Sequence, residues 1–294
     1  MVKIKQKLVD FRVKELLNLE VNNGRYAYFI LKKKGYNTLD AIEILAKKLR
    51  INLKNFGVAG NKDKFAETEQ YLSILNCNKN KIENLNLEDL KLEFVGYGKK
   101  RINLGDNTGN EFEIKVYDYN KYYGDNFFIN YFGEQRFGKE NWIIGKRILK
   151  KEKINLDAKR KRFCISSYQG YLWNKAVKIL LRRSYLKNIF EVGDYIFLNR
   201  KIRNIKVPLI NFDTNLNNKI GKIYLELMKN EGIKKDDFIF RDDPRLTTET
   251  VYRNLIVKVD KVSFKSDILR FRLPKGSYAT VFIRGLFRED IEYV

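Results

Sequence analysis

The sequence contains no histidine, and this absence excludes several classes of active site. Without imidazole there is no Ser-His-Asp triad, no Cys-His pair and no zinc site with a histidine ligand. Acid–base chemistry must come instead from carboxylates, lysines or tyrosines. The phosphate-binding motifs G-x-x-x-x-G-K-[ST] and G-x-G-x-x-G are missing as well, so nothing in the sequence marks a site for a nucleotide cofactor.

Cysteine and long apolar runs are also scarce. Cys77 and Cys164 lie far apart and form no Cys-x-x-Cys pair, which leaves a disulfide framework or a zinc knuckle without support. No apolar run approaches the roughly 18 residues of a membrane span, and the basic N-terminus lacks the apolar core of a secretory signal. We therefore expect a cytoplasmic protein with no membrane partner, built as two domains or one large one.

Positive charge is the strongest signal in the composition. Lys and Arg total 59 against 36 Asp and Glu, a formal net charge of +23. Such an excess favours nucleic acid over an anionic membrane surface, because contacts to phosphates release condensed counterions. A proteome that is rich in Lys throughout would be the alternative explanation. The 18 Tyr and 20 Phe can supply stacking surfaces for unpaired bases, although most must belong to the core.

Hydrophobic periodicity predicts strands toward both ends of the chain and helices in the middle. Strands are expected at 11–15, 26–31, 71–75, 92–97, 111–117, 195–198, 268–273 and 278–284, and helices at 39–49, over most of 141–186 and at 220–230. The strands at 92–97 and 111–117 are expected to pair with each other. Thr38 is the expected N-cap of the helix at 39–49.

Residues 60–70, Gly-Asn-Lys-Asp-Lys-Phe-Ala-Glu-Thr-Glu-Gln, form a dense polar stretch with Asp63 as its central carboxylate. The stretch lies between a helix pattern and a strand pattern, where a rigid scaffold commonly positions binding and catalytic groups. A solvated turn, whose charges serve only solubility, is the alternative interpretation.

Residues 130–138, Asn-Tyr-Phe-Gly-Glu-Gln-Arg-Phe-Gly, combine three aromatic and four polar side chains with two glycines. This composition suits a flat ligand held by stacking and by hydrogen bonds to its edges, although a loop that closes over the core is the commoner use of it. The basic run from Lys146 to Arg162, with aromatics following at 168–173, could line an RNA groove or face solvent.

Three stretches, in this order, resemble the signatures of one family, the TruD pseudouridine synthases. Residues 60–70 match its pattern G-x-K-D-x-x-A-x-T-x-Q. Residues 130–138 are similar to its second signature over the full length, and residues 271–280 followed by Arg284 are similar to its C-terminal one. The resemblance covers almost the whole chain and is weakest over about 187–245.

The resemblance implies an α+β fold. Its pseudouridine synthase catalytic domain is a largely antiparallel mixed sheet with flanking helices, and an α/β TRUD domain is inserted into it. The catalytic domain would comprise residues 1–153 and 250–294, and the inserted domain residues 154–249. The tRNA would bind in the basic cleft between the two domains, and the family demands no particular oligomeric state.

The resemblance also implies an activity, the isomerisation of a tRNA uridine, such as that at position 13, to pseudouridine. The N-glycosidic bond breaks, the uracil turns, and C5 bonds to C1′ of the ribose. An aspartate serves as nucleophile or as charge stabiliser for the sugar, so no metal or redox cofactor is needed. The target base has to be flipped out of its stack.

Carried over residue by residue, the family pattern makes Asp63 the catalytic aspartate and Arg284 the group that pairs with it. Asn130 would hydrogen-bond the carboxylate or the base edge, and Phe132 would stack on the uracil. Phe132 cannot accept a proton, so the group that removes the C5 proton stays open. The remaining substrate-binding candidates are Lys62, Gln70 and Tyr278, of which the first two would hold the loop or contact phosphate.

The chain departs from the family pattern at Gly285, where relatives often carry Glu, and at Asn61, where a hydrophobic residue is common. These departures affect the expected loop geometry and rate. Two other functions are also considered. One is an RNA-binding or RNA-folding protein on the same scaffold with weak or no catalysis. The other is a glycosidase that uses Glu134, which is disfavoured because nothing marks a second carboxylate and the net charge does not suit a neutral sugar.

Overall fold

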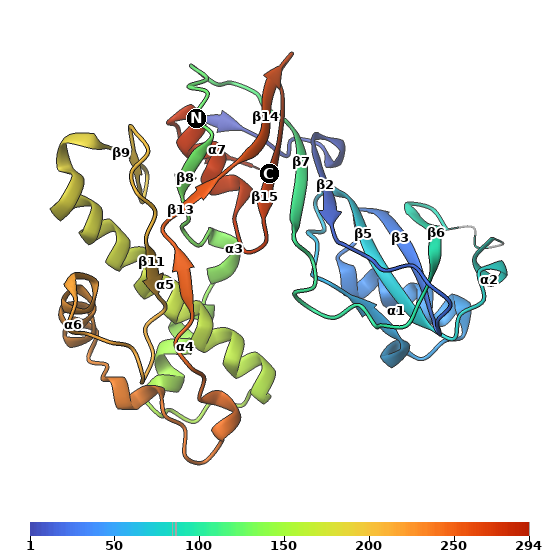
Figure 1. Cartoon of the computed structure of the whole chain (residues 1–294), viewed down its shortest axis with the longest axis horizontal. Coiled ribbons are helices and arrows are strands. Elements are labelled where there is room, and N and C mark those ends of the chain that lie inside the picture. The colour runs from blue at the N-terminus through green and yellow to red at the C-terminus, as the bar shows by residue number, and fades with distance from the viewer. Residues whose placement is uncertain (84, 86, 294) are drawn as a thin grey trace. The chain divides into compact units, whose positions relative to one another are not determined.

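The computed structural model describes residues 1–83, 85 and 87–293, which form two compact units (Figure 1). Unit 1 comprises 1–122, 259–276 and the chain from Ile291 on; unit 2 comprises 123–258 and 277–290. The limits expected for an inserted domain, 154 and 249, are not limits of either unit, because the segments on both sides of them pack within unit 2. The assignment of a catalytic and an inserted domain stays a prediction.

Unit 1 is built on an eight-stranded mixed sheet with the order β14-β15-β7-β2-β5-β3-β6, in which β4 also pairs with β5. Only the β2–β5 pairing is parallel. The strands are β2 (Phe11–Leu16), β3 (Tyr26–Lys34), β4 (Phe56–Val58), β5 (Glu67–Leu75), β6 (Leu90–Gly98), β7 (Gly109–Lys115), β14 (Asp260–Lys265) and β15 (Ile268–Pro274). A separate parallel pair joins β1 (Val2–Lys3) to β16 (Ile291–Glu292). The largely antiparallel sheet predicted from the sequence is confirmed.

One face of the sheet is covered by α1 (Thr38–Leu49). Its buried stripe, which includes Ile42 and Leu45, packs with Phe29 of β3 and Leu72 of β5 in one hydrophobic cluster. Asn37, and not Thr38, caps the helix, its side chain accepting a hydrogen bond from the backbone N–H of Asp40. The prediction that Thr38 is the N-cap is wrong, because its hydroxyl donates a hydrogen bond to Gln70 of β5. Shorter helices in unit 1 are η1 (Leu8–Asp10), η2 (Leu53–Asn55) and α2 (Asn80–Glu83).

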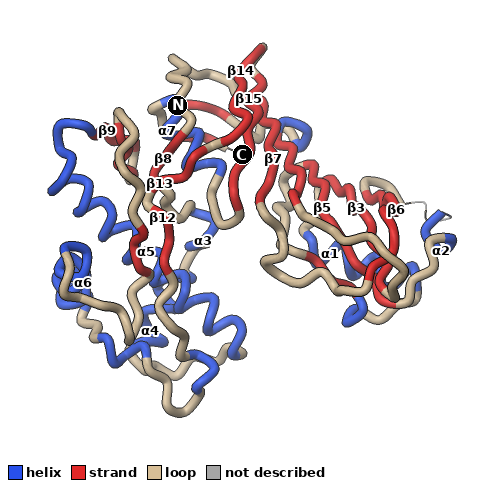
Figure 2. Tube along the Cα trace, in the orientation of Figure 1, coloured by secondary structure: helices blue, strands red, loops and turns tan. Residues whose placement is uncertain are grey.

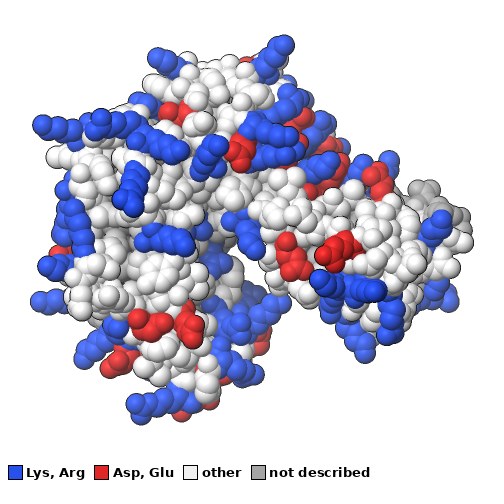
Figure 3. Space-filling model, in the orientation of Figure 1, with Lys and Arg blue, Asp and Glu red and all other residues white. Residues whose placement is uncertain are grey.

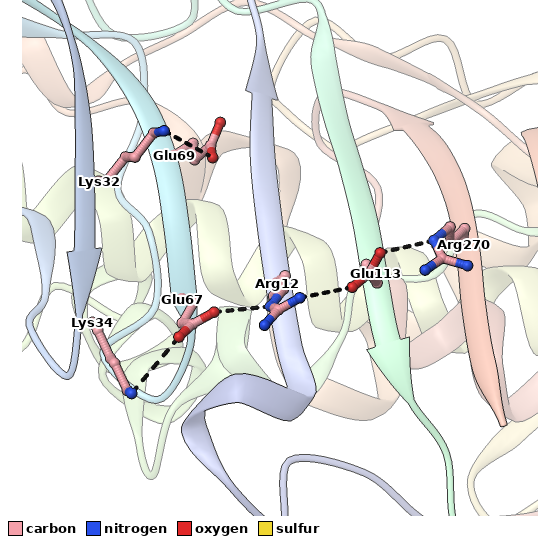
Figure 4. Close-up of polar contacts among 7 residues, drawn as sticks. All are labelled: Arg12, Lys32, Lys34, Glu67, Glu69, Glu113 and Arg270. Atoms are coloured by element: carbon pink, nitrogen blue, oxygen red, sulfur yellow. Dashed lines mark hydrogen bonds and ion pairs between the residues drawn. The ribbon is translucent and has the colours of Figure 1, made fainter. Parts of the chain in front are cut away.

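The opposite face of the sheet carries charges whose sign alternates from strand to strand (Figure 4). Arg12 of β2 lies between Glu67 of β5, at 2.8 Å, and Glu113 of β7, at 3.0 Å. Glu113 in turn pairs with Arg270 of β15 at 2.8 Å, and Glu67 with Lys34 of β3 at 3.7 Å. Each exposed pair contributes little by itself. A wrong strand order would place like charges opposite each other, so the ladder favours this arrangement.

Two expectations about strands are wrong. The strands at 92–97 and 111–117 exist, but β6 pairs with β3, whereas β7 pairs with β2 and β15. Residues 279–284 belong to a helix, α7 (Ala279–Phe287), which is buried on nearly all sides, and Tyr278 is its N-cap residue. A short and continuously apolar run has no periodicity that separates a buried strand from a buried helix.

Unit 2 is mainly helical, with three small antiparallel strand pairs (Figure 2). Its helices are α3 (Glu134–Phe137), α4 (Asn141–Leu149), α5 (Ala158–Tyr185), α6 (Lys219–Glu231) and α7, with η3 (Leu186–Asn188), η4 (Lys235–Phe238) and η5 (Pro244–Leu246). The pairs join β8 (Phe127–Ile129) to β13 (Ile256–Lys258), β9 (Ile189–Val192) to β10 (Tyr195–Leu198), and β11 (Lys206–Pro208) to β12 (Tyr252–Asn254). The helices predicted at 141–186 and 220–230 are confirmed, and their apolar faces share one core cluster.

Positive charge is present on both units but is larger on unit 2. Unit 2 has 31 Lys and Arg against 17 Asp and Glu, a net charge of +14, whereas unit 1 has 28 against 19, a net charge of +9. Lys and Arg side chains are spread over the visible face of each unit (Figure 3). Among the described residues, no helix is long and apolar enough to cross a membrane.

The charge ladder predicts the effect of reversing its central member. Arg12→Glu should lower the free energy of unfolding by about 1–2 kcal/mol, because two attractive cross-strand pairs become two repulsive ones. The loss should shrink at 1 M salt, where exposed charges are screened. Lys54→Glu, which makes the same charge change at an exposed position, is the control. Equal losses for the two variants in urea unfolding would contradict the ladder's role.

Candidate functional site

Asp63 lies in a short loop of unit 1 between β4 and β5, and this loop is held at both ends. The strand β5 begins at Glu67, so the loop is shorter than the polar stretch of the sequence suggests. The buried Gln70 donates from Nε2 to the carbonyl oxygen of Gly60 at 3.2 Å. The hydroxyl of Thr38 donates to Gln70 Oε1 and accepts from the backbone N–H of Lys62, each at 2.8 Å.

A buried ion pair holds the residue before Asp63. Lys62 Nζ lies 2.5 Å from Glu15 Oε1, and these side chains are 7% and 0% exposed. Glu15 Oε2 accepts a hydrogen bond from the backbone N–H of Tyr71 at 3.0 Å, which satisfies the second oxygen. Removing one partner of such a pair costs roughly 3–5 kcal/mol. The contacts of Lys62 and Gln70 therefore support the loop-holding role; their contact with substrate stays a prediction.

The carboxylate of Asp63 is ionised and accessible. Its Oδ2 atom lies 2.5 Å from Lys5 Nζ, and the side chain is 39% exposed. Burial raises the pKa of Asp63, but the hydrogen bond and charge of Lys5 and the backbone N–H groups of Lys64 and Phe65 outweigh burial and bring the pKa below its ordinary value. Sequence reasoning missed Lys5, because nothing distinguishes it from its basic neighbours 58 residues before the aspartate.

A second buried lysine supports the backbone of the loop. Lys33 Nζ donates to the carbonyl oxygen of Asp63 at 2.9 Å and to that of Tyr36 at 2.5 Å. Burial lowers the pKa of Lys33 to about 8, against the opposing effect of the Asp63 charge. Lys33 stands in the row Lys32-Lys33-Lys34, whose outer members face the charge ladder. Only the period of the strand could have shown that the middle lysine points inward.

Asn130 and Phe132 lie together in unit 2, directly after β8, and both are buried. Asn130 donates from Nδ2 to the carbonyl oxygen of Asn254 at 3.1 Å. The backbone of Phe132 is clamped by the side-chain amide of Asn174 on α5, which accepts from its N–H at 3.0 Å and donates to its carbonyl oxygen at 2.9 Å. Asn174 is another residue whose role no sequence motif marks.

The ring of Phe132 packs closely against α5 and lies near Tyr278. A Cβ atom on Gly170 of α5 would lie 3.2 Å from this ring, so glycine is what lets the helix approach. Tyr278, at the start of α7, has its ring centroid 6.2 Å from that of Phe132. The structure thus brings three of the predicted residues together within unit 2, namely Asn130, Phe132 and Tyr278.

Arg253 links Asn130 to Phe132. Its Nε atom donates to the carbonyl oxygen of Asn130 and its Nη2 atom to Asn130 Oδ1, both at 2.7 Å. The guanidinium lies 4.1 Å from the centroid of the Phe132 ring, which is a cation–π contact. Burial lowers the pKa of Arg253 to about 10. No motif in the sequence marks this residue, which lies more than 120 positions after the pair it holds.

Arg284 is buried on α7 and is held by two carboxylates of its own unit. Its Nε atom donates to Asp290 Oδ1 and its Nη2 atom to Glu134 Oε1, both at 2.7 Å. Burial lowers the pKa of Arg284, but Asp290 and Glu134 outweigh burial, so the net direction is upward. A pairing with Asp63, which belongs to unit 1, stays a prediction. The Nη1 atom of Arg284 has no hydrogen-bond partner among the described residues.

Close packing inside unit 2 explains why a glycine stands at position 285, where the chain departs from the family pattern. A Cβ atom at this position would lie 3.0 Å from the ring of Phe197 on β10. A larger residue would push α7 away from that strand. The glycine therefore reflects packing inside unit 2.

Each unit holds a different kind of chemical group. Unit 1 presents an ionised carboxylate, as nucleophilic or electrostatic catalysis requires. Unit 2 holds a buried aromatic ring beside a buried side-chain amide, and these are group types suited to a planar ring with polar edges.

Comparisons with known proteins agree with the motifs. The family model described as tRNA pseudouridine synthase D (TruD) matches residues 1–154 and 198–286. The tRNA pseudouridine synthase D of Aquifex aeolicus is 29% identical, with 99% of each chain covered. A crystal structure from Methanosarcina mazei, described as that of a putative tRNA pseudouridine synthase D, superposes with a TM-score of 0.69 at 20% identity, covering 98% of this chain and 93% of that one. At this identity the structural likeness shows the fold.

The Lys5–Asp63 contact predicts a measurable change in the pKa of the carboxyl group. Lys5→Met should raise the pKa of Asp63, because burial would no longer be opposed by the ammonium. The measurement is a carboxyl-carbon NMR titration of Asp63. Lys3→Met, which removes the lysine of the exposed Lys3–Asp118 pair, should leave Asp63 unchanged. An unaltered Asp63 titration in Lys5→Met would show that Lys5 does not control this group.

The Arg253 contacts predict a loss of stability. Arg253→Met should lower the free energy of unfolding by about 2–4 kcal/mol, because it leaves buried acceptors of Asn130 without their charged donor. Arg182→Met, which breaks an exposed pair with Glu191, should cost about 1 kcal/mol or less. The check is denaturant unfolding of both variants. A loss of the same small size for both would mean that Arg253 does not hold Asn130.

Proposed function

The chain belongs to the TruD family of pseudouridine synthases. We propose that it converts the uridine at position 13 of tRNA into pseudouridine, and that Asp63 is the catalytic residue. The observation that carries the proposal is the state of Asp63. It is the one carboxylate specified by the pattern that residues 60–70 match, its pKa is lowered, and its side chain is 39% exposed. A residue kept ionised and reachable in a rigid loop suits attack on a sugar carbon.

In the proposed reaction, the bond between N1 of uracil and C1′ of ribose breaks while Asp63 either bonds to C1′ or stabilises its positive charge. The detached uracil turns, and its C5 atom bonds to C1′ as any bond between Asp63 and C1′ breaks. The C5 proton then leaves and N1 gains a proton, which gives the isomeric product. Because the product is an isomer of the substrate, the reaction requires no oxidant or reductant. The contacts of Lys62, Gln70 and Lys33 with the loop support catalysis by limiting the motion of the carboxylate.

The groups of unit 2 would receive the flipped base. Phe132 would stack on the uracil, and the amide of Asn130 would hydrogen-bond its edge or the carboxylate. Their rigidity supports this role, since Arg253 and Asn174 hold both residues in place. Holding them in place before binding reduces the entropy lost when the base enters.

The tRNA itself would bind through phosphate contacts. The net charges of +14 on unit 2 and +9 on unit 1 support a polyanion that contacts both units. These contacts would offset the few kcal/mol that flipping a stacked base costs. Cytoplasmic tRNA is the expected substrate pool.

The decisive experiment compares Asp63→Asn with the native protein on unmodified tRNA. Native protein should form pseudouridine, whereas Asp63→Asn should form none while binding tRNA within about threefold of native, since its backbone contacts remain. Asp118→Asn, which alters an exposed Lys–Asp pair of the same kind, is the control and should retain full activity. Pseudouridine is quantified by mass spectrometry of the nuclease-digested RNA.

Two results would contradict the proposal. Product formation by Asp63→Asn would remove Asp63 from the chemistry. Tight tRNA binding without product from the native protein, across the full tRNA set, would replace the enzyme with an RNA-binding protein on the same scaffold. Product at a uridine other than position 13 would correct the site and leave the mechanism intact.

A further inference from the structure

We propose that Arg136 and Phe163 of unit 2 form a subsite for a nucleotide that neighbours the target uridine in the RNA. Arg136 would bind a phosphate oxygen of that nucleotide, and Phe163 would stack on its base. The inference rests on the proposed function, because it takes Phe132 as the residue that receives the target uracil.

The first observation is that Arg136 bridges Phe132 to an aromatic ring at the surface. Its guanidinium lies 5.9 Å from the centroid of the Phe132 ring and 5.0 Å from that of the Phe163 ring. Arg136 belongs to α3 and Phe163 to the first turns of α5, which contact each other. A base on Phe163 would therefore belong to a nucleotide close to the one at Phe132.

The second observation is that α3 is fixed on α5 at this point. Ser167 Oγ donates to the carbonyl oxygen of Arg136 at 2.9 Å, and Arg136 Nη2 donates to the hydroxyl of Ser166. These bonds orient the guanidinium before any ligand arrives. A preorganised Arg loses less entropy on binding a phosphate than a free surface lysine would.

The third observation concerns the charge of Arg136. Among the described residues, no carboxylate forms an ion pair with it, and its Nε atom is buried without a hydrogen-bond partner. Burial lowers its pKa, which means that the cation has lost part of its hydration. A partly desolvated guanidinium with unused donors is costly unless an anion completes it, and its planar fork matches phosphate oxygens.

The fourth observation is the exposure of Phe163. It is 42% exposed, although phenylalanine is ordinarily buried. The four residues before it, Lys159 to Arg162, are all basic and stand at the N-terminal end of α5. Cations at this end oppose the helix dipole. Asp157, the N-cap residue, supplies one negative charge there, which the four cations exceed. An exposed aromatic ring among cations is the arrangement by which proteins stack single-stranded bases beside a charged backbone.

These observations favour RNA over other partners. An apolar protein surface would match Phe163 but would leave Arg136 and the basic turn without a counter-charge. A free phosphate would match Arg136 but would leave the aromatic ring exposed. A nucleotide within a chain satisfies both groups at once.

The stacking half of the proposal is tested with three substitutions of one residue. Phe163→Ala and Phe163→Leu should each raise KM for tRNA roughly 5- to 100-fold, with kcat unchanged within about threefold, because each removes base stacking. Phe163→Tyr should restore native KM. Leu186→Ala, at another exposed apolar side chain of unit 2, is the matched control and should change neither constant.

The Phe163→Leu variant distinguishes stacking on a base from apolar packing alone. If Phe163→Leu behaves as native protein while Phe163→Ala does not, the ring serves packing, and the stacking site is overturned. The stacking site is also overturned if KM is unchanged in both variants, or if kcat falls while KM stays constant.

The phosphate half is tested by the salt dependence of tRNA binding. Arg136→Gln should reduce the slope of log K against log salt concentration by about 0.7–0.9, the value for one lost phosphate contact. Thermal unfolding of the variant shows whether unit 2 is intact. A folded Arg136→Gln protein with the native slope would overturn the assignment.

Abasic RNA identifies the nucleotide. An abasic residue next to the target uridine should weaken binding to native protein, and this penalty should vanish with Phe163→Ala if that base stacks on Phe163. Equal penalties for both proteins at each nearby position would overturn the subsite. Failure of the proposed function gives a different result, since native protein would then form no pseudouridine while the binding comparison could still be made.

Discussion

The buried ion pair between Lys62 and Glu15 is the interaction on which the candidate site depends. It joins β2 to the loop before β5 and is excluded from water. Removing either partner would leave an uncompensated buried charge. The backbone N–H of the same lysine is bonded to Thr38, at the start of α1. Strand, helix and loop are thereby tied together immediately before Asp63, whose own carboxylate is left accessible. The loop can be rigid without being buried, which is what an attacking group needs in order to meet its substrate in a fixed geometry.

In unit 2, a buried cation also holds the candidate site residues, but it packs against an aromatic ring and not a carboxylate. Arg253 is buried against Phe132 and donates its hydrogen bonds to the side-chain amide and the carbonyl oxygen of Asn130. A guanidinium suits this environment because it is planar, can stack on a ring and is more weakly hydrated than an ammonium group. Arg284, by contrast, is held by carboxylates. The same residue type therefore serves two purposes, and only the neighbours show which.

Charge is used differently in the two units. On the sheet face of unit 1, positive and negative strands alternate, so much of the charge is neutralised locally and helps to define strand order (Figure 4). Unit 2 keeps a larger excess of cations, and part of it stands at the beginning of α5, where it opposes the helix dipole. Both units keep a net positive charge after their ion pairs are counted, and the larger excess is on unit 2.

The sequence by itself determined the family, because motifs are local properties of the chain, and through that resemblance it predicted the largely antiparallel sheet. Periodicity predicted the helix that covers the sheet. The roles of Asp63, Asn130 and Phe132 stay predictions. The sequence did not determine that β6 pairs with β3, because hydrophobic alternation specifies the face of a strand and not its neighbour. It misassigned residues 278–284, because an apolar run of that length is the same whether buried as strand or helix. Only the tertiary structure showed which side chains hold the candidate site residues. Lys5 contacts Asp63, Asn174 contacts Phe132, and Arg253 contacts Asn130. Each lies tens of residues or more from the group it holds, and the distance between two such side chains is a property of the fold alone.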